Sequence, residues 1–279
     1  MTQYGMILDL DKCNGCYNCF IACKDEYCGN DHPPYSLAQP LTGQFWMKMV
    51  EKERGTLPKV KVAYTPVPCM HCKKARCVEM SDSGEVYRRP DGIVVIDPVK
   101  AQGKREIVNS CPYRVIYWNE EKNIPQKCTL CAHLLDQGYE EPRCVEACPT
   151  GALVFGDLDD PESEVSKLMG SGKAESLYPA FNLNEKVQYI GLPKRFVAGT
   201  VILADRDDVY AENAAVTVTG EDGEKQVSTD NFGDFELDGL GPDRKYTVGI
   251  EYPGYMTATY TVETKTDVYL GEITLNPEV

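Results

Sequence analysis

The cysteines constrain this chain more than any other residue type. Thirteen cysteines occur among 279 residues, and twelve of them fall into short, regularly spaced blocks. The blocks are Cys13-x2-Cys16-x2-Cys19-x3-Cys23, Cys69-x2-Cys72-x4-Cys77, a single Cys111 followed by Pro112, and Cys128-x2-Cys131-x12-Cys144-x3-Cys148-Pro149. Such spacings are typical of loops that wrap iron–sulfur clusters. We therefore expect a fold that is organised largely around metal.

The order of the blocks predicts which cysteines share a cluster. In the bacterial ferredoxin run, three closely spaced cysteines bind one cluster, and the fourth, which precedes a proline, binds the other cluster of a pair. Applied here, this crossing rule predicts three complete sets of four thiolates. They are Cys13, Cys16, Cys19 and Cys148 (cluster 1), Cys128, Cys131, Cys144 and Cys23 (cluster 2), and Cys69, Cys72, Cys77 and Cys111 (cluster 3). Cys28 is left over, and a lone cysteine is typically a packed or free thiol.

A fourth set is missing as a whole. Counting back from Cys111 with the same spacing reaches Ala101, Lys104 and Ile107, and counting forward from Cys77 by the x3 step reaches Ser81. Random loss of ligands would leave a half-occupied set, whereas here three sets are intact and one is gone. We therefore predict three 4Fe–4S clusters and a vacated fourth site, where Lys104 fills the space and charge that the absent cluster left.

Two other uses of clustered cysteines are weaker. Zinc sites are usually built from two Cys-x2-Cys pairs separated by a spacer, often with histidines, and four cysteines as close as those of the first block are too dense for one tetrahedral ion. Disulfides are disfavoured because no secretory signal precedes the array. Iron ligation remains the interpretation that uses all twelve residues.

Three segments differ in composition. Residues 1–156 hold the cysteines and predict a double ferredoxin-like domain of the α+β class, with a second module inserted at about 66–125. Residues 157–196 predict a connector that carries scattered aromatic residues. Residues 197–279 contain short runs rich in Val, Thr, Tyr and Ile, separated by turn residues. That pattern predicts an all-β sandwich or barrel.

Charge and hydropathy exclude some partners. The net charge is −14, and residues 197–279 contain 17 acidic and 5 basic residues, so the acidity lies mainly there. Nucleic acid is excluded as a partner, because phosphate binding needs a basic face. No apolar run reaches the ~18 residues of a membrane span, and no export signal is recognised at the N-terminus. A cytoplasmic location is expected; the alternative is export together with a partner that carries a Tat signal.

The cysteine blocks resemble a known family. With Asp91-Gly92-Ile93-Val94 and Cys148-Pro149-Thr150-Gly151-Ala152, they are similar to the iron–sulfur (β) subunits of the DMSO-reductase family of molybdopterin enzymes over about residues 3–156. Within that family, five strings look like the transhydroxylases that act on polyphenols: Glu53-Arg54-Gly55-Thr56, Pro68-Cys69-Met70-His71-Cys72, Cys111-Pro112-Tyr113, Tyr117-Trp118-Asn119-Glu120-Glu121 and Gln126-Lys127-Cys128-Thr129. The segment Thr229–Phe235 with Gly254-Tyr255 resembles transthyretin-like or carboxypeptidase-regulatory-like modules.

The resemblance implies an electron-transfer subunit without an active site of its own. Its partner would be a large catalytic subunit that holds bis-molybdopterin guanine dinucleotide with Mo or W, in a heterodimer or a higher oligomer. In the four-cluster relatives the missing cluster is the far terminus, which passes electrons to a membrane partner. Its loss favours polyphenol transhydroxylation or dehydroxylation. Two alternatives stay open: a scaffold whose clusters carry no electrons during turnover, and the β subunit of a respiratory molybdenum reductase.

Overall fold

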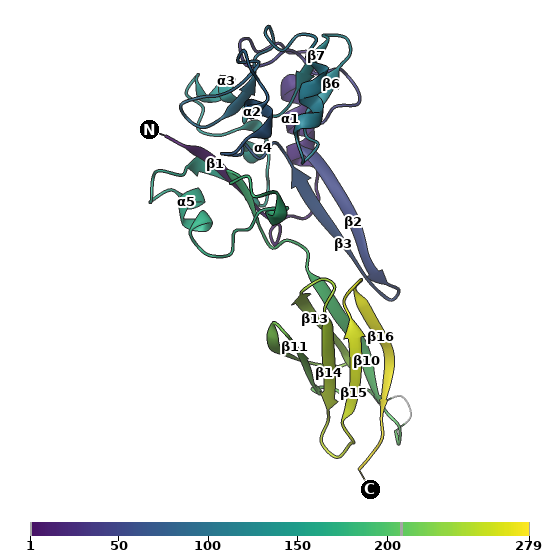
Figure 1. Cartoon of the computed structure of the whole chain (residues 1–279). Helices are drawn as coiled ribbons and strands as arrows, with labels where there is room; N and C mark the ends of the chain where they lie inside the picture. Colours follow the sequence, from purple (N-terminus) through teal and green to yellow (C-terminus); the bar gives the residue numbers. More distant parts are fainter. Residues whose placement is uncertain (1, 207–208, 279) are drawn as a thin grey trace. The chain divides into compact units, whose positions relative to one another are not determined.

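A computed structural model describes residues 2–206 and 209–278 of the chain (Figure 1). The chain divides into two compact units. The first, here called the cysteine unit, comprises the residues up to Glu51 together with Tyr64–Leu192. The second, here called the β unit, comprises Lys52–Ala63 and the residues from Pro193 onward.

A three-stranded sheet lies at the centre of the cysteine unit. Strand β1 (Tyr4–Asp9) pairs antiparallel with β8 (Leu153–Asp157) and parallel with β9 (Val187–Ile190). Both faces of β1 are covered: Met6 and Leu8 belong to the core that contains the cysteines, whereas Ile7 packs with residues of α5 (Glu164–Met169). Because alternate side chains of a strand point to opposite faces, one strand supports both layers.

The connector predicted at 157–196 differs in the structure. Residues up to Leu192 belong to the cysteine unit, and they include α5, the short helix η2 (Pro179–Phe181) and β9. Val187 and Tyr189 of β9 are fully buried beside β1. Most of the segment predicted as a connector, residues 157–192, is therefore part of the cysteine unit.

The remaining elements of the cysteine unit are short, as the loop-rich sequence predicted. Most helices are single turns, and the strands form two-stranded ribbons. The helices are α1 (Asn18–Tyr27), α2 (Arg76–Glu79), η1 (Arg105–Ser110), α3 (Ala132–Leu135) and α4 (Arg143–Glu146). The ribbons pair β4 (Val86–Arg88) with β5 (Val94–Ile96), and β6 (Tyr117–Asn119) with β7 (Ile124–Gln126).

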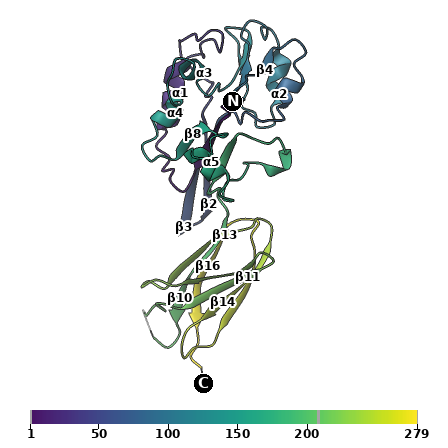
Figure 2. The same cartoon turned by 90° about the vertical axis from the view of Figure 1, so that its left-hand side faces the viewer.

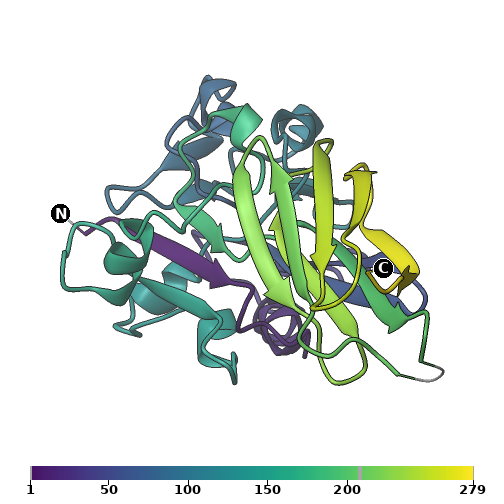
Figure 3. The same cartoon turned by 90° about the horizontal axis from the view of Figure 1, so that it is seen from below.

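The β unit is a seven-stranded sandwich within the described residues, so the all-β prediction is confirmed. One sheet has the order β13-β10-β16 and the other β12-β11-β14-β15, and the strands can be followed in Figures 2 and 3. The strands are β10 (Arg195–Leu203), β11 (Ala215–Gly220), β12 (Gly223–Ser228), β13 (Asp234–Leu240), β14 (Lys245–Glu251), β15 (Ala258–Glu263) and β16 (Val268–Leu275). On β14 the alternate residues Tyr246, Val248 and Ile250 are buried in the core.

A long hairpin, β2 (Lys48–Thr56) with β3 (Lys59–Val67), was not predicted from the sequence. Its outer part belongs to the β unit, where lysines of β3 form ion pairs with acidic residues at alternate positions of β13. The pairs are Lys59–Asp234 at 2.8 Å, Lys61–Asp238 at 2.6 Å, and Lys61–Glu236. These partly exposed pairs are each worth little, but their common spacing fixes the register of hairpin and strand.

A buried ion pair in the β unit makes a testable contribution to stability. Arg54 Nη1 lies 3.8 Å from Asp267 Oδ1, both side chains are buried, and the backbone N–H of Phe196 donates to the same Oδ1 at 3.1 Å. We predict that Asp267→Ala lowers the stability of the β unit by about 3 kcal/mol, because it leaves a buried guanidinium unpaired. Hydrogen exchange of peptides from β10 and β16 measures the change. The matched control, Lys265→Ala, removes an exposed charge two residues away; equal effects of both substitutions would contradict the prediction.

Candidate iron–sulfur sites

Helix α1 supplies one cysteine to each of two sites. Cys19 and Cys23 are one turn apart, and both lie on the buried face of the helix. Cys144 of α4 and Cys148, which follows that helix, have the same spacing, and α1 packs against α4. The crossing predicted by the ferredoxin rule therefore has a simple geometric basis: residues i and i+4 share a helix face but lie a full turn apart along the axis.

The electrostatics of the thiols show which sulfurs are neighbours in the first two sites. Burial first, and then the nearby Cys13 and Cys148, raise the pKa of Cys19 to about 12, and Cys16 adds to the rise. Burial followed by Cys128 and Cys131 raises the pKa of Cys23 well above its ordinary value. The pKa of Cys144 is raised by burial and then by Cys131, Cys23 and Cys128. The structure thus brings together the two sets that the spacing predicted.

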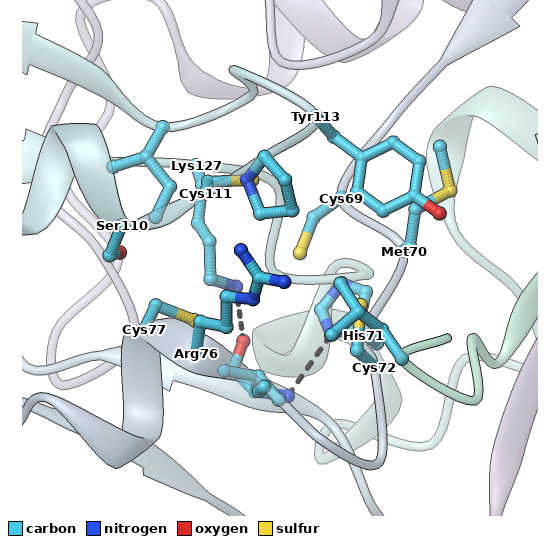
Figure 4. A pocket seen from close by; sticks show the side chains of 15 residues that line it. Cys69, Met70, His71, Cys72, Arg76, Cys77, Ser110, Cys111, Tyr113 and Lys127 are labelled. Carbon is cyan, nitrogen blue, oxygen red and sulfur yellow. Dashed lines mark hydrogen bonds between the residues drawn. The ribbon is translucent and has the colours of Figure 1, made fainter. Parts of the chain in front are cut away.

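The third site is a pocket whose only cysteines are the third predicted set (Figure 4). Cys69 and Cys72 come from the loop before α2, Cys77 from α2, and Cys111 from the end of η1. Burial first, and then Cys69, raise the pKa of Cys72 far above its usual range, and Cys111 and Cys77 add to the rise. The four sulfurs therefore face one another across this pocket.

The cysteine loops share a backbone conformation. In three of the four Cys-x2-Cys pairs the residue before the second cysteine has a positive φ: 71° for Gly15, 43° for His71 and 50° for Leu130. At Gly15 a Cβ would lie 2.6 Å from the ring of Tyr64, so glycine is required there. Leu130 N–H donates to Cys128 Sγ at 3.4 Å. A left-handed residue at this position turns the loop back on itself, so that both thiols of a pair point to the same side.

These donor sets fit 4Fe–4S clusters. All thirteen cysteines lie in the described part of the chain, and each is a free thiol. In the third pocket, His71 is completely buried; its Nδ1 accepts the N–H of Val94 at 3.0 Å, so Nε2 carries the proton, and this N–H has no partner in the protein. A buried donor without a partner is costly unless a ligand accepts from it, and cluster sulfur is such an acceptor. His71 therefore bonds the backbone through Nδ1 and keeps Nε2–H as a donor that faces no acceptor in the protein.

The three sites lie in a row. Cys19 of the first site adds to the raised pKa of Cys144 in the second, after burial and the cysteines of that site itself. Burial and then Cys69 of the third site raise the pKa of Cys128 in the second to about 12. The second site is therefore the neighbour of both others. Ligation of iron by the twelve cysteines stays a prediction, and the structure supplies the arrangement that it requires.

The vacated fourth position is filled mainly by apolar side chains. Ala101 and Ile107 are buried in a small core with Val86, Val94 and Ile96. We expected Lys104 to fill the space and charge of the absent cluster. Its half-exposed side chain does not fill the space, but its charge lies 3.8 Å from Glu85 Oε1 at the edge. The closely packed core leaves no room for a long side chain.

A buried carboxylate occupies the edge of the vacated position. Ser81 Oγ donates to Glu85 Oε2 at 2.7 Å and accepts the N–H of Val86 at 2.9 Å, and Lys104 Nζ lies 3.8 Å from Glu85 Oε1. The hydrogen bond from Ser81, followed by two backbone N–H groups, lowers the pKa of Glu85 to about 2. Two of the four vacated residues thus hold an acid that sequence reasoning did not single out.

A second group missed by the sequence joins three helices. Glu26 of α1 accepts from His133 Nε2 of α3 at 2.8 Å and from Arg143 Nε of α4 at 2.9 Å. Burial opposes ionisation here, but these two hydrogen bonds lower the pKa of Glu26 below its usual value. His32 stacks on His133 with ring centroids 3.8 Å apart. Arg143 already neutralises the Glu26 carboxylate. We therefore assign the group a structural role, which is to hold α1, α3 and α4 together.

Comparison with known proteins agrees with this arrangement. The family model for a 4Fe-4S dicluster domain matches residues 60–158, and the model for a carboxypeptidase regulatory-like domain matches residues 197–276. The small subunit of pyrogallol hydroxytransferase from Pelobacter acidigallici is 38% identical over 281 residues, which cover 99% of this chain and 100% of that protein. The chain belongs to the iron–sulfur subunits of the DMSO-reductase family.

Other members of the family match a smaller share of this iron–sulfur subunit. A putative iron–sulfur subunit of dimethyl sulfoxide reductase from Halobacterium salinarum is 32% identical over 77% of this chain and 90% of its own length. The arsenate respiratory reductase iron–sulfur subunit of a Shewanella species is 31% identical over 67% of this chain and 96% of its own length. The predicted fold class, a ferredoxin-like 4Fe–4S domain followed by a carboxypeptidase-regulatory-like sandwich, is confirmed. Among the described residues, no helix has the length and apolar character needed to cross a membrane.

Packing at the vacated position gives one prediction. Ile107→Ala removes most of a buried side chain and leaves a cavity, so we expect it to destabilise the cysteine unit by about 2–4 kcal/mol. Val99→Ala is the control, because Val99 is 80% exposed. Urea denaturation of the iron-loaded protein, followed through Trp118 fluorescence, compares the two. Similar stabilities would show that residue 107 is not part of a packed core.

The assignment of the third site gives another prediction. Replacing Cys111 by serine is expected to remove one cluster, so that about four irons per chain are lost. Cys28→Ser is the matched control, because Cys28 is also partly buried but lies outside the three sets, and it should retain all the iron. Iron and sulfide analysis of both variants decides; equal losses would contradict the assignment.

Proposed function

We propose that this chain is the three-cluster electron-transfer subunit of a complex whose large subunit holds bis-molybdopterin guanine dinucleotide with Mo or W and acts on polyphenols, as a transhydroxylase or dehydroxylase. One observation carries the proposal: the similarity to the small subunit of pyrogallol hydroxytransferase spans both the cysteine unit and the β unit. The matches to the two reductase iron–sulfur subunits described above cover a smaller part of the chain.

The arrangement of the sites supports this assignment. When bound, 4Fe–4S clusters exchange single electrons at potentials set by net charge, hydrogen bonds to sulfur, and exposure. The three thiol sets lie in a row, and the position of a fourth is packed with Ala101, Ile107 and their apolar neighbours. A row that stops at the third site fits a complex in which electrons do not leave toward a membrane partner. Hydroxyl transfer between polyphenols requires no such outlet, and we place the complex in the cytoplasm.

A scaffold role is the second candidate, and the composition of the core favours it. The main core of the cysteine unit contains Cys19, Cys23, Cys69, Cys128, Cys131 and Cys144 among its buried residues. Clusters bound there would replace apolar packing and stabilise the unit whether or not they carry electrons. Freeze-quench EPR during turnover separates the two roles, because clusters that only support the fold keep one oxidation state throughout.

Purification of the complex tests the proposed function. We expect an affinity tag on this chain to recover a large molybdenum- or tungsten-containing subunit in a 1:1 ratio. Three clusters predict about 12 irons per copy of this chain. As a transhydroxylase, the purified complex should convert polyphenols with neither an electron donor nor an electron acceptor added; as a dehydroxylase, it should do so only with an added electron donor. A stable monomer without a partner, or about 16 irons per chain, would contradict the proposal.

A further inference from the structure

Lys127 is a buried cation without a carboxylate partner. The residue is 2% exposed, and its Nζ donates to the carbonyl oxygens of Val94 and, at 3.0 Å, of Cys128. Among residues 2–206 and 209–278, no acidic side chain lies within ion-pair distance of it. A buried ammonium is costly unless negative charge compensates it, and two carbonyl groups supply only part of that compensation.

The position of Lys127 suggests where the compensating charge comes from. Its side chain lines the third pocket with Cys69, Cys72, Cys77 and Cys111, and it directly precedes Cys128 of the second site (Figure 4). Lys127 therefore lies between two predicted cluster sites.

The ammonium acts electrostatically on thiols of both sites. Burial raises the pKa of Cys77 to about 11, and Lys127 is the strongest influence that opposes this rise. It also opposes the rise at Cys128. The Cys128 carbonyl to which Lys127 donates and the pocket that it lines put this charge beside the second and third sites.

Other basic residues near the third site are exposed, neutral or only partly buried. Arg76 lines the same pocket, but its side chain is exposed, so solvent screens it. His71 is buried but neutral, because burial first, and then Lys127 and Lys186, lower its pKa well below the ordinary value. Arg88 donates to the carbonyl of Cys72 at 2.6 Å but is only partly buried and does not line the pocket. Among the residues that line it, Lys127 therefore supplies the buried positive charge.

We infer that the ammonium of Lys127 is a counter-ion shared by the second and third clusters, and that it raises the reduction potentials of these two relative to the first. The inference rests on the three-cluster function proposed above and deepens it. A cluster with four thiolates is negatively charged, and reduction adds one more negative charge. A fixed positive charge in a dry site therefore stabilises the reduced state more than the oxidised state. Electrons would then reside at the second and third sites, which together form a reservoir.

Potentiometric EPR titration of the purified complex tests this inference. Lys127→Met removes the charge and keeps most of the side-chain volume. We expect it to weaken reduction of two clusters by at least tenfold, a shift of about 59 mV to lower potential for a one-electron couple, and to leave one cluster unchanged. Lys127→Arg keeps the charge and should preserve all three potentials. The signal of the third cluster is identified by its absence in Cys111→Ser.

A matched control comes from Lys186, which is also 2% exposed but bonds Gln3 and does not line the third pocket. Its charge also acts on His71 of that pocket, but from outside the lining, so Lys186→Met should shift the potentials of the second and third clusters less than Lys127→Met does. If Lys127→Met loses iron, Lys127→Gln replaces it, because its amide can still donate to the carbonyls. Loss of the same clusters in both neutral variants would overturn the inference in favour of a role in assembly. Three unchanged potentials, or three equal shifts, would also overturn it. Failure of the proposed function would instead appear in the wild-type complex, as a number of cluster signals other than three.

Discussion

One turn of helix between two thiols is the constraint on which the cysteine unit depends. In α1, Cys19 and Cys23 point to the same side but to different sites, and Cys144 and Cys148 repeat this spacing at α4. Two clusters tied through the same two helices cannot be placed independently of each other. This explains how a unit with single-turn helices and two-stranded ribbons can have a defined core, since bonds from sulfur to iron would replace the apolar contacts that longer elements supply.

The same four-residue spacing can be counted from the cysteines of the third site into the vacated fourth position, where the ligands are absent. Ser81 stands four residues after Cys77, and Ile107 stands four residues before Cys111. In place of a cluster, the protein has an apolar core and the acid Glu85, which Ser81 and Lys104 hold at its edge. Lys127, which lines the third site and donates to the carbonyl of Val94 in this same core, supplies a buried positive charge. The third site therefore adjoins both a position packed with protein and a buried cation.

Sequence reasoning predicted the parts of the molecule that local pattern determines. The cysteine spacings gave the three sets that the structure brings together, and period-two alternation gave the strands of the sandwich. Sequence reasoning missed the elements whose structure depends on contacts between residues that are distant in sequence. The hairpin β2–β3 was missed although Lys59-Val60-Lys61-Val62 alternates, because β2 is mostly polar and the lysines of β3 pair with acids of β13 that are far away in sequence. Strand β9 was hidden in a polar segment, because only pairing with β1 makes it a strand. Lys127 and Glu85 looked like ordinary surface charges, because the identity of a single charged residue does not show whether its side chain is buried.

The central claim is that three clusters lie in a row and that the fourth position is filled by protein. Anomalous diffraction at the iron absorption edge, from crystals of the intact complex, tests it most directly. The account predicts three four-iron peaks in this chain, each bonded to one of the three cysteine sets, with the peak of the second set between the other two. An iron peak beside Ala101 and Ile107, or a cluster that draws its ligands from a different combination of cysteines, would contradict the account.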